Sequence, residues 1–140
     1  PILVRAGAFG DGLPHQDLIL SPNHRVMLSD WRAEYLFGAA EVLVAIKTLV
    51  NDNTIIRMTN ASSVNYHHIL LDQHAVVRSN GIDAESLLPG PMALQSLDAD
   101  AGREIMDIFP DLRMPDAENG LSAGAILKTY EATAMGHLAI

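Results

Sequence analysis

Short apolar runs separated by turn-forming residues fill the first ninety positions of the chain. The runs occupy residues 2–5, 18–20, 25–28, 42–44, 54–58, 63–71 and 74–78. Glycine, proline, asparagine or aspartate separates most of them, which is typical of strands joined by hairpins. Asp11-Gly12 and Asn80-Gly81 are natural two-residue turns, and the Asn-Asp-Asn run at 51–53 tolerates left-handed backbone geometry. The pattern predicts a mainly β fold of short strands and hairpins over residues 1–90.

The pattern changes to helical spacing after the Pro-Gly-Pro sequence at 89–91. One helix is predicted to begin at a cap on Asp98 or Asp100 and to run through Phe109, where Pro110 stops it. Its predicted apolar stripe consists of Ala101, Ile105, Met106 and Phe109.

Ser122 is predicted to cap a second helix. The apolar face of that helix would consist of Ile126, Leu127, Tyr130, Ala134 and Leu138. Two such short helices are unstable in isolation. Residues 91–140 are therefore expected to form a helical C-terminal extension that packs on the β body of the same domain.

Polar side chains interrupt the apolar runs at one bend. Ser21 and His24 stand in a Ser-Pro-Asn-His step between the runs 18–20 and 25–28, where a strand turn would present a hydroxyl and an imidazole. Imidazole is the side chain best matched to proton transfer near neutral pH. His24 is therefore a candidate catalytic residue. Ser21 precedes Pro22, and a serine in that position is often only a turn former.

Three more histidines, His67, His68 and His74, lie in the runs 63–71 and 74–78. Adjacent residues of a strand point to opposite faces, so at most one of His67 and His68 can enter a given pocket. A zinc site needs three or four convergent ligands, and His24, His68 and His74 would converge only if the two strand pairs met. A histidine-based metal site is therefore a less favoured alternative, and the sequence predicts no cofactor.

The stretch around Ser21 and His24 and the later stretch that contains His67, His68 and His74 together resemble the Hint module. This is the autoprocessing domain shared by Hedgehog proteins and inteins, and the likeness is to its bacterial Hint_2-type branch. The resemblance rests on the Ser21-x-x-His24 step and on a later pattern made of Tyr66, His74, Asn80 and Gly81. Further similar segments are residues 1–10, 17–22, 43–51 and 130–132. The likeness extends over most of the chain and is strongest over residues 1–90.

The resemblance implies catalytic roles for four residues. In Hint domains, the histidine that matches His24 polarises a carbonyl or protonates the leaving amide nitrogen during an N-to-S or N-to-O acyl shift. Ser21 would be its partner hydroxyl, His74 the second motif histidine, and Asp72 a nearby carboxylate. His24 and His74 are accordingly expected to lie within reach of one pocket around the scissile bond.

The chain departs from the family pattern at both cleavage positions. Hint domains begin with a nucleophilic cysteine or serine, but this sequence has no cysteine and no serine or threonine near Pro1. Inteins cleave at a His-Asn pair, whereas residues 82–86 read Ile-Asp-Ala-Glu-Ser. We therefore expect the C-terminal portion of a processing domain, inactive in self-cleavage by itself. Its expected partner is a missing N-terminal Hint segment or a fused protein, or a second copy that pairs through exposed strand edges.

Composition narrows the remaining possibilities. A chain of 140 residues with 49% hydrophobic content is long enough for one compact core. The formal net charge of −8 and the lack of basic clusters argue against nucleic acid and anionic membranes as partners. No apolar run has the length of a membrane span, and the first residues lack a cleavable signal pattern.

Two other functional interpretations are compatible with parts of the sequence. Pro1 followed by Ile-Leu-Val resembles the start of small tautomerases that use an N-terminal proline as general base, but residues 6–40 predict no helix between two parallel strands. Pro1 is instead interpreted as a fragment boundary within the Hint-like pattern. The second alternative is a non-catalytic binding or assembly module. Trp31 and Tyr35 show no site pattern and are predicted to pack under a loop.

Overall fold

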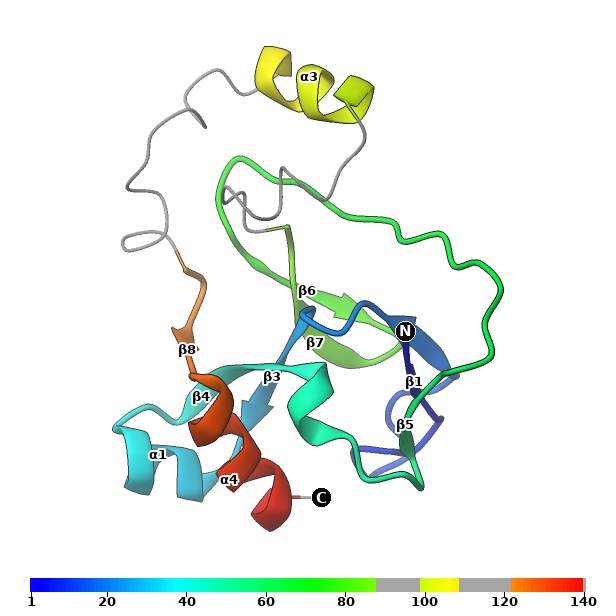
Figure 1. Ribbon diagram of the computed structural model, residues 1–140. Coiled ribbons are helices and arrows are strands. Elements are labelled where there is room, and N and C mark those ends of the chain that lie inside the picture. Colours follow the sequence, from blue (N-terminus) through cyan, green and yellow to red (C-terminus); the bar gives the residue numbers. More distant parts are fainter. Residues whose placement is uncertain (88–98, 109–121, 140) are drawn as a thin grey trace.

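The computed structural model describes residues 1–87, 99–108 and 122–139, and its strands form two sheets (Figure 1). Sheet A has the strand order β2-β1-β5 and consists of β1 (Ile2–Val4), β2 (Leu18–Leu20) and β5 (Ile55–Arg57). Sheet B has the order β6-β7-β3-β4-β8 and consists of β3 (Arg25–Ser29), β4 (Glu41–Ala45), β6 (Val76–Ser79), β7 (Ile82–Glu85) and β8 (Ala125–Ile126). All pairs are antiparallel except β4 with β8. The expected mainly β fold is confirmed.

Four helices accompany the sheets within the described ranges: α1 (Trp31–Phe37), the 3₁₀ helix η1 (Ile46–Leu49), α3 (Ala99–Ile108) and α4 (Thr129–Ala139). Figure 1 shows α4 lying against η1 and β4, the elements with which it makes contact. None of the helices in the described part of the chain is long and apolar enough to cross a membrane.

The core lies where the two sheets, η1 and α4 meet. Its buried side chains are Ile2, Val4, Ala8, Val26, Ala33, Val42, Val44, Ile46, Leu49, Ile55, Ile82, Ala84, Ala132 and Met135. Alternation along the strands selects these residues, because successive side chains of a strand point to opposite faces. Val26 of β3 pairs with Val44 of β4 and with Ala84 of β7, and all three are buried. Their neighbours Arg25 and Glu85 therefore lie on the opposite face of sheet B.

Several local predictions are confirmed. Strand β2 has the predicted bounds, and β1, β3, β4, β5 and β6 differ from their predicted ranges by a residue or two at their ends. Asn80 and Gly81 form the turn between β6 and β7, with φ values of 48° and 92°. Asp52 also has a positive φ, 56°, as the tolerance of its segment for left-handed geometry suggested.

The strand predicted over residues 63–71 is wrong. This stretch has no regular secondary structure, and Ile69 and Leu71 are exposed. It is joined to the segment that follows β7 by a hydrogen bond from the backbone N–H of Leu87 to the carbonyl of Ile69, at 2.7 Å. The residue types favour a strand only where a neighbouring strand is available for pairing.

Helix α1 was not predicted, and it places Trp31 and Tyr35 in solvent rather than under a loop. These side chains are 71% and 81% exposed. The helix begins at Asp30, whose carboxylate accepts the N–H of Arg32, and ends at Gly38 in left-handed geometry. Ala33 is its one fully buried residue, so the helix has no apolar stripe that the sequence could reveal.

The C-terminal helix begins later than predicted and buries a different face. Ala125 and Ile126 pair with β4 as a strand, while the hydroxyl of Ser122 donates to the carbonyl of Gly124 instead of capping a helix. The residues of α4 that enter the core are Ala132 and Met135, whereas Tyr130 and Ala134 are exposed. The side chain of Leu138 lies outside the described residues. Helix α3 matches the first predicted helix, although Asp98, Phe109 and Pro110 also lie outside the described residues.

Candidate functional site

The Ser21–His24 step forms the turn between β2 and β3. The backbone N–H of His24 donates to the carbonyl of Ser21 at 3.0 Å, which closes the turn. The turn is attached to η1, because Ile46 N–H donates to the His24 carbonyl at 2.9 Å and Lys47 N–H donates to the Pro22 carbonyl at 3.1 Å. Ser21 and His24 are both half-buried. Their backbones are thus fixed, and their side chains retain some access to solvent.

Burial lowers the pKa of His24 from its ordinary value of 6.5, and nearby charges modify this effect. The carboxylate of Glu85 acts in the opposite direction and raises the pKa, whereas His68 and Arg25 lower it further. A histidine with a lowered pKa is predominantly neutral near neutral pH, when one ring nitrogen can accept a proton and the other can donate one.

His74 precedes β6 and is enclosed, with a side chain that is 0% exposed. Its Nδ1 accepts a hydrogen bond from the backbone N–H of Ala123 at 3.0 Å. In a neutral imidazole the nitrogen that accepts carries no proton, so the ring proton of His74 is on Nε2. Nε2 lies 3.3 Å from Oε2 of Glu85. This distance is that of an ion pair, but Nε2 makes no hydrogen bond to any described residue, so we regard the contact as electrostatic.

Glu85 lies at the end of β7 and connects the other parts of the site. Oε1 accepts the backbone N–H of Arg25 at 2.8 Å, and Oε2 accepts Nη1 of the Arg25 guanidinium at 2.9 Å. Its side chain is only 9% exposed. Sequence reasoning did not select Glu85, whose place beside His74 follows from the register of the β6–β7 hairpin and whose contact with Arg25 depends on the pairing of β3 with β7. An acidic residue following the buried Ala84 at the end of a predicted hairpin was the available signal.

Ser86, the next residue, has a structural contact. It is buried, its Oγ accepts the backbone N–H of Ala75 at 3.0 Å, and its own N–H donates to the Ala75 carbonyl at 2.8 Å. Glu85 and Ser86 belong to the segment 82–86, in which the resemblance leads us to expect the His-Asn pair of inteins. Both residues here hold the segment beside His74.

The other predicted residues are less closely connected with the site. Asp72 is exposed, and the carboxylate that lies beside His74 is that of Glu85. His67 and His68 are also exposed, although the charge of His68 acts on His24. Within the described ranges, no group of three or more His, Asp or Glu side chains could hold a metal ion.

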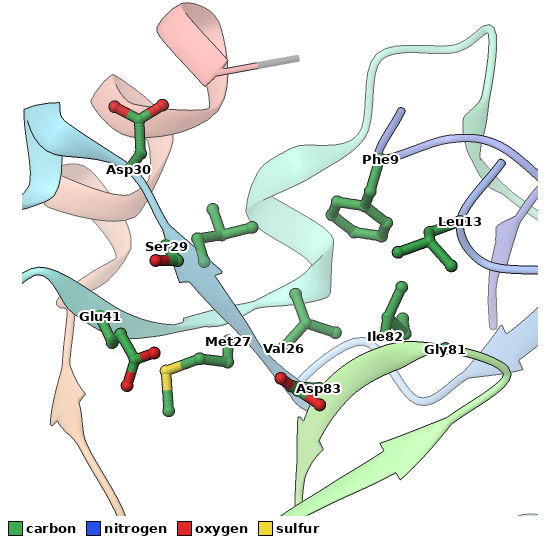
Figure 2. A pocket seen from close by; sticks show the side chains of 11 residues that line it. Phe9, Leu13, Val26, Met27, Ser29, Asp30, Glu41, Gly81, Ile82 and Asp83 are labelled. Atoms are coloured by element: carbon green, nitrogen blue, oxygen red, sulfur yellow. The ribbon is translucent and has the colours of Figure 1, made fainter. Parts of the chain in front are cut away.

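A separate pocket of about 260 Å³ opens where β3 and β7 diverge (Figure 2). Phe9 and Leu13 from the β1–β2 connection and Ile82 from β7 give it an apolar wall, and Glu41 and Asp83 lie at its polar side. The Asp83 carboxylate accepts hydrogen bonds from the Arg78 guanidinium. None of the four residues predicted to be catalytic lines this pocket. It is therefore distinct from the cluster around Glu85.

The structure thus brings His24, His74 and Glu85 into one electrostatic cluster, with His24 the more accessible of the two histidines. Comparison with known proteins agrees with the sequence resemblance: the family model described as the Hint domain matches residues 1–91. Searches of curated proteins and of solved structures gave no match to this chain. Because the family model covers well over half of the 140 residues, the chain belongs to the Hint domain family.

Proposed function

We propose that this chain is the C-terminal portion of a Hint-type self-processing domain and that His24 is its proton-transfer residue. The observation that carries the proposal is the state of His24: half-buried, placed at a fixed turn and with its pKa lowered by burial. A neutral imidazole of this kind suits general acid and base catalysis near neutral pH.

The proposed reaction is an acyl shift at a peptide bond that precedes a cysteine or serine nucleophile. The nucleophile transfers its proton to the neutral imidazole of His24 and attacks the carbonyl carbon, forming a tetrahedral intermediate. The C–N bond of the amide then breaks while a C–S or C–O bond is retained, giving a thioester or ester. His24 delivers a proton to the leaving nitrogen, and hydrolysis or transfer to a second nucleophile then releases the acyl segment.

Ser21 and His74 have different supporting roles in this proposal. The Ser21 hydroxyl is three residues before His24 in the same fixed turn, and it would serve as a hydrogen-bonding partner at the reaction centre. His74 has a fully enclosed side chain, so it would act by fixing the site rather than by touching the substrate. Asp72 is exposed, and a role for it would require contact with a segment outside this chain.

The nucleophile would come from outside these 140 residues, which contain no cysteine. We propose that it is supplied by an N-terminal Hint segment or by a fused protein, and that the isolated chain does not cleave itself. A second copy of the chain is the alternative partner for its strand edges.

Intact-mass analysis tests this proposal on two samples, the 140-residue chain and the natural precursor polypeptide that contains it. Each is incubated with dithiothreitol and with hydroxylamine, which cleave thioesters and esters. We expect the isolated chain to remain intact and the precursor to be cleaved, with the cleavage abolished by His24→Ala. The exposed His67 provides the matched control, His67→Ala, which should leave cleavage unchanged. Thiol-dependent cleavage within residues 1–140, or full cleavage of the His24→Ala precursor, would contradict the proposal.

One observation favours a second candidate function, a non-catalytic binding or assembly module. Trp31, Tyr35 and Leu36 on α1 are all exposed, and aromatic residues are enriched at protein interfaces. Two results together would favour this alternative. The precursor would stay intact with dithiothreitol and with hydroxylamine, and the Trp31→Ala substitution would abolish binding to a partner protein.

A further inference from the structure

The two ring nitrogens of His74 face groups of opposite kind. The Ala123 N–H donates to Nδ1 at 3.0 Å, and Oε2 of Glu85 lies 3.3 Å from Nε2. The alternative tautomer would place an N–H at Nδ1 against the Ala123 N–H and a lone pair at Nε2 against a carboxylate. Both contacts would then be repulsive, so the surroundings select the tautomer with its proton on Nε2.

The Glu85 carboxylate is itself fixed. Two N–H groups of Arg25, one from the backbone and one from the guanidinium, donate to its two oxygens at 2.8 and 2.9 Å. Charge-assisted hydrogen bonds of this kind restrict the orientation of a carboxylate. The anion also acts on His24, because its charge opposes the effect of burial on the pKa of that imidazole.

The donor on the other side of His74 belongs to a part of the chain beyond the family match, which ends at residue 91. Ala123 is held by the strand that follows it, since Ala125 and Ile126 pair with Val42 and Leu43. Leu127 N–H donates to the carbonyl of Leu43 at 3.0 Å, which continues this attachment. The C-terminal segment therefore contributes directly to the site.

We propose that Glu85 is a positioning residue: held by Arg25, it fixes His74 with the Ala123 N–H as the tautomer protonated on Nε2. The link to processing rests on the proposed function, whereas the tautomer itself does not. In a self-processing reaction, His74 would act through Glu85 on His24, which is the histidine that can reach a substrate.

Nuclear magnetic resonance of the ¹⁵N-labelled 140-residue chain tests the proposal, because protonated and unprotonated imidazole nitrogens have well-separated ¹⁵N shifts. We expect His74 to show an unprotonated Nδ1 and a protonated Nε2 at neutral pH. Glu85→Gln should abolish this single-tautomer signature, since a neutral amide supplies less attraction and also presents N–H donors. Glu85→Asp keeps the charge and should partly restore it.

Asp83→Asn is the matched control for the loss of charge. Asp83 is on the same strand and the same face as Glu85, but its carboxylate is paired with the exposed Arg78. This variant should leave the His74 signals unchanged. Ala123→Pro removes the N–H donor and should shift Nδ1 of His74, whereas Ala123→Gly keeps the donor and should not.

A protonated Nδ1 in the unmodified chain would overturn the proposal, as would a Glu85→Gln chain that remains folded and keeps the original His74 signals. If Glu85→Gln fails to fold, the unmodified chain and Glu85→Asp still provide the decision. A precursor that does not cleave would contradict the proposed function while leaving these tautomer measurements unaffected.

Discussion

His24 and His74 differ in burial and in hydrogen bonding, and this difference supports different roles for them in the proposed reaction. His74 is enclosed, and one of its ring nitrogens accepts a backbone N–H. His24 is half-buried, and its imidazole makes no hydrogen bond to the part of the chain that the structure describes. A proton-transfer residue must be able to contact the substrate, so His24 fits that role and His74 fits a positioning role.

The lowered pKa of His24 predicts a pH dependence of stability. The folded chain binds fewer protons than the unfolded chain as the pH falls below about 6.5, the ordinary histidine value. The free energy of unfolding should therefore decrease as the pH falls from 7.5 through this value towards the lower folded-state pKa. His24→Gln should flatten this dependence, which thermal melts at a series of pH values between 7.5 and 5 would measure.

The control is His67→Gln, which removes an exposed imidazole and should retain the original pH dependence. Asp30 and Asp83 do not interfere, because hydrogen bonds from Arg32 and Arg78 hold the pKa values of these carboxyls below their ordinary range. If the free energy of unfolding of the His24→Gln chain varied with pH as it does in the unmodified chain, another group would be responsible for the pH dependence.

The sequence points to the candidate site residues that belong to local motifs, and it does not point to Glu85 or to its contact with Arg25. Ser21 and His24 are three positions apart in one turn, and His74 precedes a recognisable hairpin, so a linear pattern contains them. Glu85 is 60 positions from Arg25, and the two meet only through the register of β3 with β7. That register is a tertiary property that apolar periodicity does not specify.

At the scale of elements, turn chemistry was more informative than strand propensity. The Asn80-Gly81 turn was predictable because few residues other than glycine and asparagine accept its backbone geometry. The strand predicted over 63–71 is wrong because its residue types favour a strand, whereas no described strand pairs with this segment. Helix α1 was missed because its short sequence buries one residue fully and leaves its aromatic side chains in water.

The β6–β7 turn is also packed against the β1–β2 connection, which predicts a cost for any side chain at Gly81. Its φ is +92°, and an added Cβ would lie 2.5 Å from Cδ2 of Leu13. Gly81→Ala should lower the free energy of unfolding by roughly 1–3 kcal/mol from backbone strain, plus the cost of displacing Leu13. Urea denaturation measures the difference.

Gly7→Ala separates the two contributions. Gly7 also has a positive φ, +78°, but an added Cβ there would meet nothing within 4 Å. This variant should therefore show the backbone strain alone and a smaller loss of stability than Gly81→Ala. Equal losses in the two variants would mean that the contact with Leu13 has no energetic consequence.

At the scale of the whole molecule, residues beyond the family match help to build the core. Met135 on α4 is fully buried beside residues of the β body. Met135→Ala should lower the free energy of unfolding by about 2–5 kcal/mol, the usual effect of deleting a large buried side chain. Tyr130→Ala is the control on the same helix: its side chain is 67% exposed, and the change should be within about 0.5 kcal/mol. Equal, small effects would show that α4 is only loosely attached.

The outer strand β2 offers the edge at which the isolated chain should associate. Among the described residues β2 pairs with β1 alone, and Ile19 is exposed beside the half-buried Leu3. An unpaired apolar edge of this kind is a template for another strand. Under the proposed function, an N-terminal segment of the precursor would cover this edge. In the isolated chain we expect a second copy to take that place, most simply through a two-fold axis.

Light scattering over a range of concentrations should therefore show a reversible dimer of the isolated chain. Ile19→Lys should shift the equilibrium towards monomer, because a charged side chain on an edge strand opposes pairing between sheets. Leu71→Lys is the matched control, since Leu71 is similarly exposed but lies in a stretch without regular secondary structure. A stable dimer would be expected to bury at least about 1,000 Å² in total. A monodisperse monomer at every concentration would mean that the described sheets need no second copy, and the β2 edge would then have to be dismissed as an assembly site.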